Sequence, residues 1–456
     1  MAVLDTVDDE DGLDARRVAA ILEAVEAADA ATLASLLAQF HAADIADLLE
    51  QISPYERRAL LHLAAAAIDG EVLSELDESI REAVIAALPR AAVAEAMREL
   101  DSDDVVDILE DLDTPQQDMI LSALDEADRM AVEQALAFPE DSAGRLMQRE
   151  VVVAPEHWTV GEAMDHLREA RHLPDQFYHV ILTDPRMRPT GYVTLGRILS
   201  SGREARLRDI LEDSFRTIEA VMPEEDVAYL FNQYHLISCP VVGAGGRLVG
   251  VITIDDAMAV LDDEHEEDML RLAGVGDGAS PSDGVLTTVR QRLPWLVVNL
   301  FTASLSALVI SQFEATLALI ITLAAVMPIV SSTGGIAGTQ SLAVAVRALA
   351  TRDLTSANAA RVVRREVMAG LLNGLGLALI LGVGGSLMYG DVWLGVVLGM
   401  AMVVNQIVAA LGGVLVPLSL ERWGLDPALA SGTFVTTLTD VMGYLAFLGL
   451  ATWLMT

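Results

Sequence analysis

Five long apolar stretches, separated by short charged segments, fill the C-terminal part of this sequence. They are Leu293–Phe313, Ala315–Val346, Val367–Gly390, Val392–Leu420 and Pro427–Thr456. Only the last contains a charged residue, Asp440. About 20 apolar residues cross the roughly 30 Å hydrocarbon core of a bilayer, and the shortest stretch has 21. Because soluble helices rarely run so long, the sequence predicts five membrane-spanning helices in a lipid bilayer.

Charge divides the chain into two unlike parts. The 456 residues include 67 acidic and 29 basic ones, for a formal net charge of −38. The part from Val285 onward holds seven acids and eight arginines, which leaves 60 acids and 21 arginines before it. Nucleic acids bind proteins largely through Lys and Arg on phosphates. We therefore expect no nucleic-acid partner for this acidic N-terminal part.

Arginine positions predict how the spans are oriented. All eight arginines of the apolar part precede the first span, or lie between spans two and three or four and five. Cytoplasmic loops are the ones enriched in Lys and Arg. With five spans, the acidic part is then cytoplasmic and the C-terminus lies outside. The sequence thus predicts a multi-pass protein of the cell membrane.

Asp440 lies near the middle of the fifth span, after Thr436, Thr437 and Thr439. Placing a carboxylate there costs roughly 3 kcal/mol on insertion scales, and such residues usually face protein or water. No basic residue within the spans could pair with it. We predict that Asp440, with the Thr436 and Thr437 oxygens, meets a cation. The alternative is a packing carboxylate bonded to a neighbouring Thr or Asn.

The available ligands favour a hard divalent ion. Mg²⁺ takes oxygen ligands and keeps several waters, which suits carboxylate and hydroxyl groups rather than Cys or His. Because each chain offers one deep carboxylate, a pore is more naturally built from two copies about a two-fold axis. The sequence therefore predicts a homodimer.

The second span contains a run of small residues that begins at Pro328 and ends at Gln340. Proline removes a backbone donor and small residues loosen a helix, which is tolerated where freed carbonyls face a neighbour or a water-filled path. Small residues also allow close helix packing. The candidate pore-helix residues, which are packing residues under the second interpretation, are Pro328, Gly334, Gly335, Gly338 and Gln340.

The first 140 residues have a helical pattern. Alanine, leucine and glutamate dominate, and apolar residues recur at three- and four-residue spacing. The segment Asp44–Pro54 recurs, with one inserted residue, as Asp104–Pro115. This repeat predicts short helices that stack into a superhelical array.

Two segments after Pro139 share a predicted order of strand, helix, strand and helix. The first copy comprises Val151–Ala154, Val160–Arg168, Tyr178–Leu182 and Thr190–Leu195. The second comprises Arg216–Val221, Asp226–Phe231, Ser238–Val242 and Arg247–Asp256. This resembles a tandem pair of CBS domains, a regulatory module that often senses nucleotides or ions. In that module a Thr-x-x-Asp often holds ribose, so Thr253 and Asp256 are candidates for an ATP site, whereas the first copy has Arg197 at the aspartate position.

An acidic segment, Asp255–Asp268, follows the second copy and is expected to be helical. Glu264, Glu267 and Asp268 stand at i, i+3 and i+4, so they share one helix face. A charge run is usually only a solvated face, and high acidity also accompanies salt adaptation. Its place before the first span nevertheless makes this helix a candidate for a cation-sensitive gate, joined to that span by the flexible segment Gly274–Pro281.

This order of parts resembles the MgtE family of magnesium channels. The most specific local matches are Pro328–Gln340, Arg347–Leu354, Asp426–Leu429 and Thr437–Asp440. The resemblance implies a multidomain membrane protein: a helical N domain at 1–140, α/β CBS domains at 141–208 and 209–256, an acidic plug helix and linker at 257–284, and an all-α pore domain at 285–456. It implies that the residue matching Asp440 binds partly hydrated Mg²⁺ in a pore on the dimer axis.

The resemblance also implies regulation, since family members close when cytoplasmic Mg²⁺ bridges acidic faces of the N domain, the CBS domains and the plug helix. The acids that match by position are Asp103, Asp107, Asp256, Glu264, Glu267 and Asp268. The chain departs from the family pattern at Ile336 (Asn), Gly432-Thr433 (Asn-Pro), Thr436 (Ala) and Ala259 (an acid). The choice among Mg²⁺, Co²⁺, Ni²⁺ and Mn²⁺ therefore stays open.

Electrostatics gives this regulation a physical basis. Two carboxylates 4 Å apart repel each other by about 4 kcal/mol at an effective dielectric constant near 20, so acidic faces separate unless divalent ions lie between them. Two alternatives remain: a membrane-anchored sensor of divalent cations or nucleotides that transports nothing, and an exchanger with different ion selectivity. An enzyme is least favoured, because the soluble part has no nucleophile–base pair, phosphate loop or metal-ligand cluster.

Overall fold

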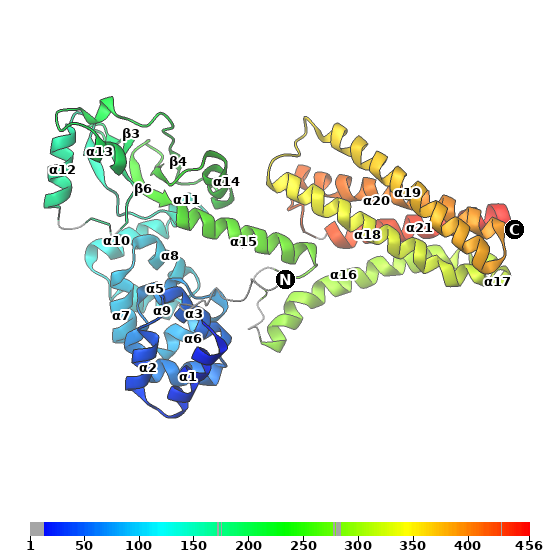
Figure 1. Ribbon diagram of the computed structural model, residues 1–456, viewed down its shortest axis with the longest axis horizontal. Coiled ribbons are helices and arrows are strands. Elements are labelled where there is room, and N and C mark those ends of the chain that lie inside the picture. Colours follow the sequence, from blue (N-terminus) through cyan, green and yellow to red (C-terminus); the bar gives the residue numbers. More distant parts are fainter. Residues whose placement is uncertain (1–12, 171–172, 175, 277–278, 280–283, 430) are drawn as a thin grey trace, which may run out of the picture. The chain divides into compact units, whose positions relative to one another are not determined.

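The computed structural model describes residues 13–170, 173–174, 176–276, 279, 284–429 and 431–456. It consists of two compact units, Met1–Glu264 and His265–Thr456 (Figure 1), and each is described by itself. The segment Gly274–Pro281, expected to be flexible, lies partly outside the described residues.

The first unit begins with the predicted array of short helices. These are α1 (Ala15–Glu26), α2 (Ala30–Leu37), α3 (Ala42–Gln51), α4 (Pro54–Leu63), η1 (Ala65–Ala67), α5 (Gly70–Ser74), α6 (Glu78–Ala87), α7 (Arg90–Glu99), α8 (Ser102–Glu110), α9 (Thr114–Leu121) and α10 (Glu126–Ala135). The repeated segments correspond to α3 and α8. Their apolar faces contribute Leu48, Leu49, Ile108 and Leu109, all fully buried, to one continuous core.

Side chains at the helix ends explain why these helices stay short. At α4, the Ser53 hydroxyl accepts a hydrogen bond from the Glu56 N–H (3.3 Å), and the Glu56 carboxylate accepts one from the Ser53 N–H (2.9 Å). This reciprocal pair satisfies donors that the first turn leaves free. Pro54 occupies the first position of α4, where its missing N–H costs nothing.

Two small sheets follow in the same unit. The elements are α11 (Ala143–Leu146), β1 (Val153–Pro155), α12 (Val160–Glu169), β2 (His179–Thr183), β3 (Pro189–Thr194), α13 (Leu195–Ser200), η2 (Leu207–Asp209), β4 (Ile218–Glu219), α14 (Glu224–Tyr234), β5 (Ser238–Val242) and β6 (Leu248–Thr253). In each sheet the first two strands are parallel and the last two antiparallel. The order predicted for each copy lacked one strand: a β-hairpin, not a single strand, precedes the last helix.

Helix α15 (Ile254–Leu272) begins in the first unit directly after β6, and its last residues belong to the second. It contains the whole predicted acidic segment. Glu264, Glu267 and Asp268 lie on it without interruption of the helix, as their spacing requires.

The second unit contains five helices long and apolar enough to span a membrane, with mean hydropathies from 1.2 to 2.1. They are α16 (Val285–Ser311), α18 (Thr322–Ala350), α19 (Ala359–Tyr389), α20 (Val392–Arg422) and α21 (Ser431–Met455), with the short α17 (Glu314–Leu319) between the first two. Helices α18 and α21 both pack on α20, and α19 runs beside it (Figure 1).

The second apolar stretch differs from its prediction in two ways. It is not one helix, because the chain leaves helical geometry at Ile320 between α17 and α18. Conversely, α18 continues through Pro328 and the glycine run, so these residues do not interrupt it. The glycines serve close packing instead: a β-carbon on Gly334 would lie 2.0 Å from the Asn405 amide nitrogen, and one on Gly338 would lie 2.6 Å from Val435.

Candidate functional site

The Asp440 carboxylate is half-buried on α21 and is held by a neighbouring helix. The hydroxyl of Ser331, on α18, donates a hydrogen bond to Asp440 Oδ1. Ser331 itself is buried. No basic side chain among the described residues forms an ion pair with Asp440. Its oxygen lone pairs are therefore not engaged by a cationic side chain among the described residues.

The two predicted threonine partners lie on the same face of α21, one turn before Asp440. Thr436 donates its hydroxyl to the Gly432 carbonyl (2.9 Å), and Thr437 donates to the Thr433 carbonyl (2.6 Å). Neither threonine donates to Asp440. The hydrogen-bond partner of the carboxylate is Ser331, whereas the alternative drawn from the sequence was a neighbouring Thr or Asn. Their hydroxyl oxygens keep lone pairs, which are what a cation or its water needs.

The remaining predicted pore-helix residues separate into buried and exposed positions on α18. Gly334 and Gly338 are buried and Gly335 is half-buried, whereas Pro328 and Gln340 are exposed in the single chain. Ile336, which stands where the family pattern has Asn, is 59% exposed.

Two amide side chains on α20 were missed by the sequence reasoning. Asn405 and Gln406 are 0% and 2% exposed, in the middle of an otherwise apolar helix. Asn405 donates to the Val330 carbonyl at 2.9 Å, and Gln406 to the Thr333 carbonyl at 3.5 Å. Adjacent amides inside a membrane span are themselves a signal, because polar groups at that depth are costly and usually serve a site.

At the start of the second unit, α15 is connected to the loop before α21. Arg271 forms ion pairs with Glu267 on its own helix (2.7 Å) and with Asp426 (2.6 Å). The Asp426 carboxylate also accepts a hydrogen bond from the Ala428 N–H (2.7 Å). Arg271 thus partly neutralises the charge of Glu267, one of the predicted sensor acids. This pairing was not identified from the sequence.

In the first unit, α8 and the start of α15 bring aspartates together. Asp103 is 8% exposed. Burial raises its pKa well above the usual range, and repulsion from Asp256, Asp104 and Asp101 adds to the rise. For the same two reasons the pKa of Asp104 rises to about 7, and among its negative neighbours Asp256 again contributes most to the rise. Burial raises the pKa of Asp256 to about 6. These four residues, Asp101, Asp103, Asp104 and Asp256, are called the α8–α15 acidic cluster below.

The second predicted sensor acid on α8, Asp107, has a different partner. Asp107 shares Arg81 with Asp111, at 2.8 and 2.6 Å. Burial raises the pKa of Asp111 to about 6 despite the arginine. A further acid that sequence reasoning missed is Glu224 at the start of α14. Burial raises its pKa to about 7, and repulsion from Asp141, Glu110, Glu264 and Asp263 contributes.

Among the described residues, no group of three or more acidic, histidine or cysteine side chains converges closely enough to enclose a metal ion.

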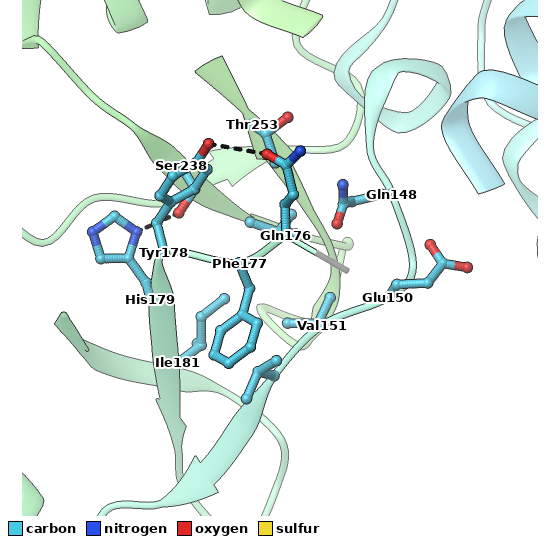
Figure 2. Close-up of a pocket in the computed structure, with 12 residues that line it drawn as sticks. Gln148, Glu150, Val151, Gln176, Phe177, Tyr178, His179, Ile181, Ser238 and Thr253 are labelled. Carbon is cyan, nitrogen blue, oxygen red and sulfur yellow. Dashed lines mark hydrogen bonds between the residues drawn. The ribbon is translucent and has the colours of Figure 1, made fainter. Parts of the chain in front are cut away.

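A small, partly open hollow of about 20 Å³ lies between the two sheets (Figure 2). Its lining residues are Gln148, Glu150, Val151, Val152, Gln176, Phe177, Tyr178, His179, Ile181, Ser238, Val251 and Thr253. Thr253 lines it as expected, but Asp256 does not. The Asp256 carboxylate instead accepts hydrogen bonds from the Thr253 hydroxyl (2.6 Å) and N–H (3.3 Å). The two residues predicted to bind ribose are therefore hydrogen-bonded to each other. Asp256 belongs to the acidic cluster.

The hollow combines apolar and polar walls. Phe177 and Tyr178 offer aromatic surface, while Gln148, Gln176 and Thr253 offer amide and hydroxyl groups (Figure 2). Flat aromatic groups with a few polar partners are typical of small-molecule sites. Glu150 reaches from this hollow to the N-terminal helices, because Ser102 at the start of α8 donates its hydroxyl to the Glu150 carboxylate at 2.9 Å.

Comparison with known proteins agrees with these features. The family model for divalent cation transporters matches residues 327–450, that for the MgtE intracellular N domain matches 40–141, and that for the CBS domain matches 143–204 and 207–263. The magnesium transporter MgtE of Thermus thermophilus is 32% identical over 96% of this chain and 98% of its own length. The chain belongs to the MgtE family. The multidomain architecture expected from the sequence, with helical, CBS and membrane parts, is confirmed.

Other members give consistent similarity. The magnesium transporter MgtE of Enterococcus faecalis is 34% identical over 71% of this chain and 71% of its own length. A crystal structure of the cytosolic domain of the Mg²⁺ channel MgtE in complex with ATP is 29% identical and has a TM-score of 0.50. It covers 53% of this chain and 99% of that domain.

Proposed function

We propose that this chain transports Mg²⁺ across the cell membrane by a channel mechanism in which Asp440 meets the ion. The observation that carries this proposal is the half-buried Asp440 carboxylate, held by the Ser331 hydroxyl and unpaired with any described basic side chain. Oxygen ligands and retained water suit Mg²⁺. The magnesium transporters to which the chain is similar support the choice of ion.

The working assembly in this proposal is a homodimer with the pore on its two-fold axis, since one deep carboxylate per chain then becomes two. The N-terminus is cytoplasmic and the C-terminus outside, which puts all eight arginines of residues 285–456 on the cytoplasmic side. The 1–140, 141–208, 209–256, 257–284 and 285–456 division of the chain is part of the same proposal.

Regulation by cytoplasmic Mg²⁺ rests on the α8–α15 acidic cluster. Its members repel one another, and the pKa values of Asp103, Asp104 and Asp256 are raised. When the cluster is assembled, these aspartates therefore bind protons at a pH at which isolated aspartates are ionised. A divalent cation satisfies the same charges at neutral pH. Mg²⁺ would be held here by Asp103 and Asp256 with its waters. The other regulatory acids in this proposal are Asp107 on α8 and Glu264, Glu267 and Asp268 along α15, and high internal Mg²⁺ would favour a closed state.

A nucleotide site, with ATP as the ligand, fits the hollow between the two sheets. The supporting observation is its lining by Tyr178, Phe177 and the polar residues around them, together with the ATP complex of the similar cytosolic domain. In this proposal Thr253 contacts the ligand and Asp256 acts indirectly, by orienting Thr253, because the Asp256 carboxylate is already engaged by that residue.

The test is divalent uptake into proteoliposomes that contain the full-length chain, with wild type and Asp440→Ala compared for Mg²⁺, Co²⁺, Ni²⁺ and Mn²⁺. Mg²⁺ flux that disappears in the variant supports transport through Asp440. Absence of flux for every ion, with the protein folded and dimeric, would favour the membrane-anchored sensor. Flux that requires a counter-ion gradient would favour an exchanger.

A further inference from the structure

Asn405 of α20 is one of two fully buried polar residues among the described residues of the membrane helices, the other being Thr439. Its side chain is 0% exposed. Its nitrogen donates to the Val330 carbonyl of α18 at 2.9 Å. Its oxygen, Oδ1, accepts no hydrogen bond from any residue that the structure describes, and it is buried as well.

The two helices on either side of Asn405 have glycine where they meet its amide. A β-carbon on Gly334 of α18 would lie 2.0 Å from the amide nitrogen, and one on Gly443 of α21 would lie 2.8 Å from it. Only glycine leaves room for this side chain at both positions. The amide is thus inserted between α18 and α21 and fixes how closely the two helices approach.

The contacts of Asn405 lie within one turn of the pair that holds the carboxylate. Val330 immediately precedes Ser331, and Gly334 follows it by three residues. Gly443 follows Asp440 by the same three residues. Since residues three apart share a helix face, the amide meets the same facing surfaces of α18 and α21 from which Ser331 and Asp440 form their hydrogen bond.

This arrangement is an inefficient way to stabilise a helix bundle. A leucine has similar volume and would leave no buried oxygen unpaired, whereas an unpaired buried amide oxygen is destabilising. The amide therefore contributes something other than stability. It fixes the position of the neighbouring backbone of α18 and α21.

We propose that Asn405 is a positioning residue for ion passage: it sets the spacing and register of α18 against α21, so that the Ser331 hydroxyl holds Asp440 in one orientation toward the ion. This inference rests on the proposed role of Asp440. Its consequence is that Asn405 determines how strongly, and how selectively, Asp440 meets Mg²⁺, without touching the ion.

The experiment compares full-length wild type, Asn405→Leu and Thr316→Val in proteoliposomes. Thr316 is a matched control: it is buried and its hydroxyl contacts that of Thr452 on α21 at 2.8 Å, three turns beyond Asp440. We expect Asn405→Leu to raise the Mg²⁺ concentration for half-maximal flux at least threefold and to reduce the ratio of Mg²⁺ to Co²⁺ flux, while Thr316→Val changes neither.

A second variant covers the case in which Asn405→Leu does not fold. In Gly334→Ala/Asn405→Ala, the new methyl group at 334 occupies part of the space of the lost amide. We expect the same change in half-saturation and ion preference. Wild-type values for both quantities, in whichever of these variants is folded and dimeric, would overturn the inference and leave Asn405 with a packing role.

The two proposals fail in different ways. If Asp440→Ala retains full Mg²⁺ flux, the proposed function is wrong and the inference about Asn405 falls with it. If Asp440→Ala abolishes flux while Asn405→Leu behaves as wild type, only the inference is wrong.

Discussion

The two units of the molecule treat their carboxylates in opposite ways. In the first unit, Asp103, Asp104 and Asp256 gather so closely that burial and mutual repulsion raise their pKa values. In the second, Asp440 is held by one hydroxyl. In the proposed function the crowded carboxylates would bind a regulatory cation. The single carboxylate would bind an ion weakly enough to release it, as passage through a pore requires.

The largest expected effect follows from removing the solitary charge. Asp440→Asn keeps the size of the side chain and loses the charge. Interactions with a charged group contribute about 1.5–3 kcal/mol, and each 1.4 kcal/mol is about tenfold, so Mg²⁺ flux into proteoliposomes should fall by about tenfold or more. Asp391→Asn is the matched control, since Asp391 caps α20 by accepting from the Trp393 N–H. Equal flux in both variants would show that the charge of Asp440 has no special role in ion passage.

A second effect tests whether the paired carboxylates of the first unit differ from the crowded ones. Arg81→Met leaves Asp107 and Asp111 without their shared arginine. Only the pair with Asp111 is largely buried, with side chains 6% and 18% exposed. Breaking a buried pair costs about 3 kcal/mol, and we expect a clear fall in the thermal unfolding temperature of the first unit. Arg129→Met is the control, because Arg129 and Glu133 are largely exposed and 3.6 Å apart. Exposed pairs contribute at most about 1 kcal/mol, so a similar fall in both would contradict the assignment.

A third prediction uses pH to sharpen the contrast. Raised carboxyl pKa values mean that the assembled cluster gains protons as pH falls, and those protons compete with Mg²⁺. Between pH 8 and pH 6 a group such as Asp104, with a pKa of about 7, goes from mostly charged to mostly neutral. The internal Mg²⁺ concentration that halves the flux should therefore rise by about tenfold as pH falls over this range.

The measurement varies the pH only on the side that carries the acidic N-terminal part, which is the cytoplasmic side in the proposed orientation. Asp104→Asn should weaken the dependence of inhibition on pH. A dependence that is unchanged in this variant would show that other groups titrate, and an inhibitory concentration that falls with falling pH would reverse the sign that the cluster requires.

The smallest effects concern packing of the second unit. On α19, a β-carbon on Gly370 would lie 2.7 Å from the Gln406 carbonyl oxygen, whereas one on Gly376 would meet nothing within 4 Å. Overpacking costs about 1–3 kcal/mol, so Gly370→Ala should lower the unfolding temperature of the solubilised protein. Gly376→Ala should leave it equal or slightly higher, since alanine favours helix over glycine by about 1 kcal/mol. Equal losses would mean that α19 does not pack on α20 here.

Most of the architecture could be predicted from local pattern. Apolar length gave the spans, the three- and four-residue spacing gave the N-terminal helices, and the alternating segments gave the two sheets. Local pattern failed where a choice depends on distant partners. The break between α17 and α18 falls at Ile320, in sequence that is as apolar as its surroundings, and Pro328 continues a helix that its chemistry suggested would loosen.

The sites were predictable only in part, for the same reason. Asp440 is conspicuous because it is charged within an apolar span, but nothing near it in sequence points to Ser331, 109 residues away. Asp103 and Asp256 were both predicted, yet only folding brings them together. Glu224 and Arg271 were missed, because an acid at a helix start and an arginine in an acidic helix are ordinary features until their neighbours are known.

The paired sheets carry a consequence for the order of ligand binding. His179 and Ser238 are the first residues of β2 and β5 and pair with Thr194 and Thr253 in equivalent registers. They hydrogen-bond to each other (Figure 2). Contact between corresponding residues is what a local two-fold axis produces. The position equivalent to the hollow beside Thr253 should therefore lie beside Thr194. There, however, the Thr194 hydroxyl is bound by Glu212 at 3.2 Å, which also pairs with Arg197 at 3.1 Å. The two equivalent threonines are therefore held by different carboxylates, Thr194 by Glu212 and Thr253 by Asp256, and Glu212 is in turn paired with Arg197. If the proposed nucleotide site exists, freeing Thr194 requires this ion pair to break as well, so a ligand should bind beside Thr253 first.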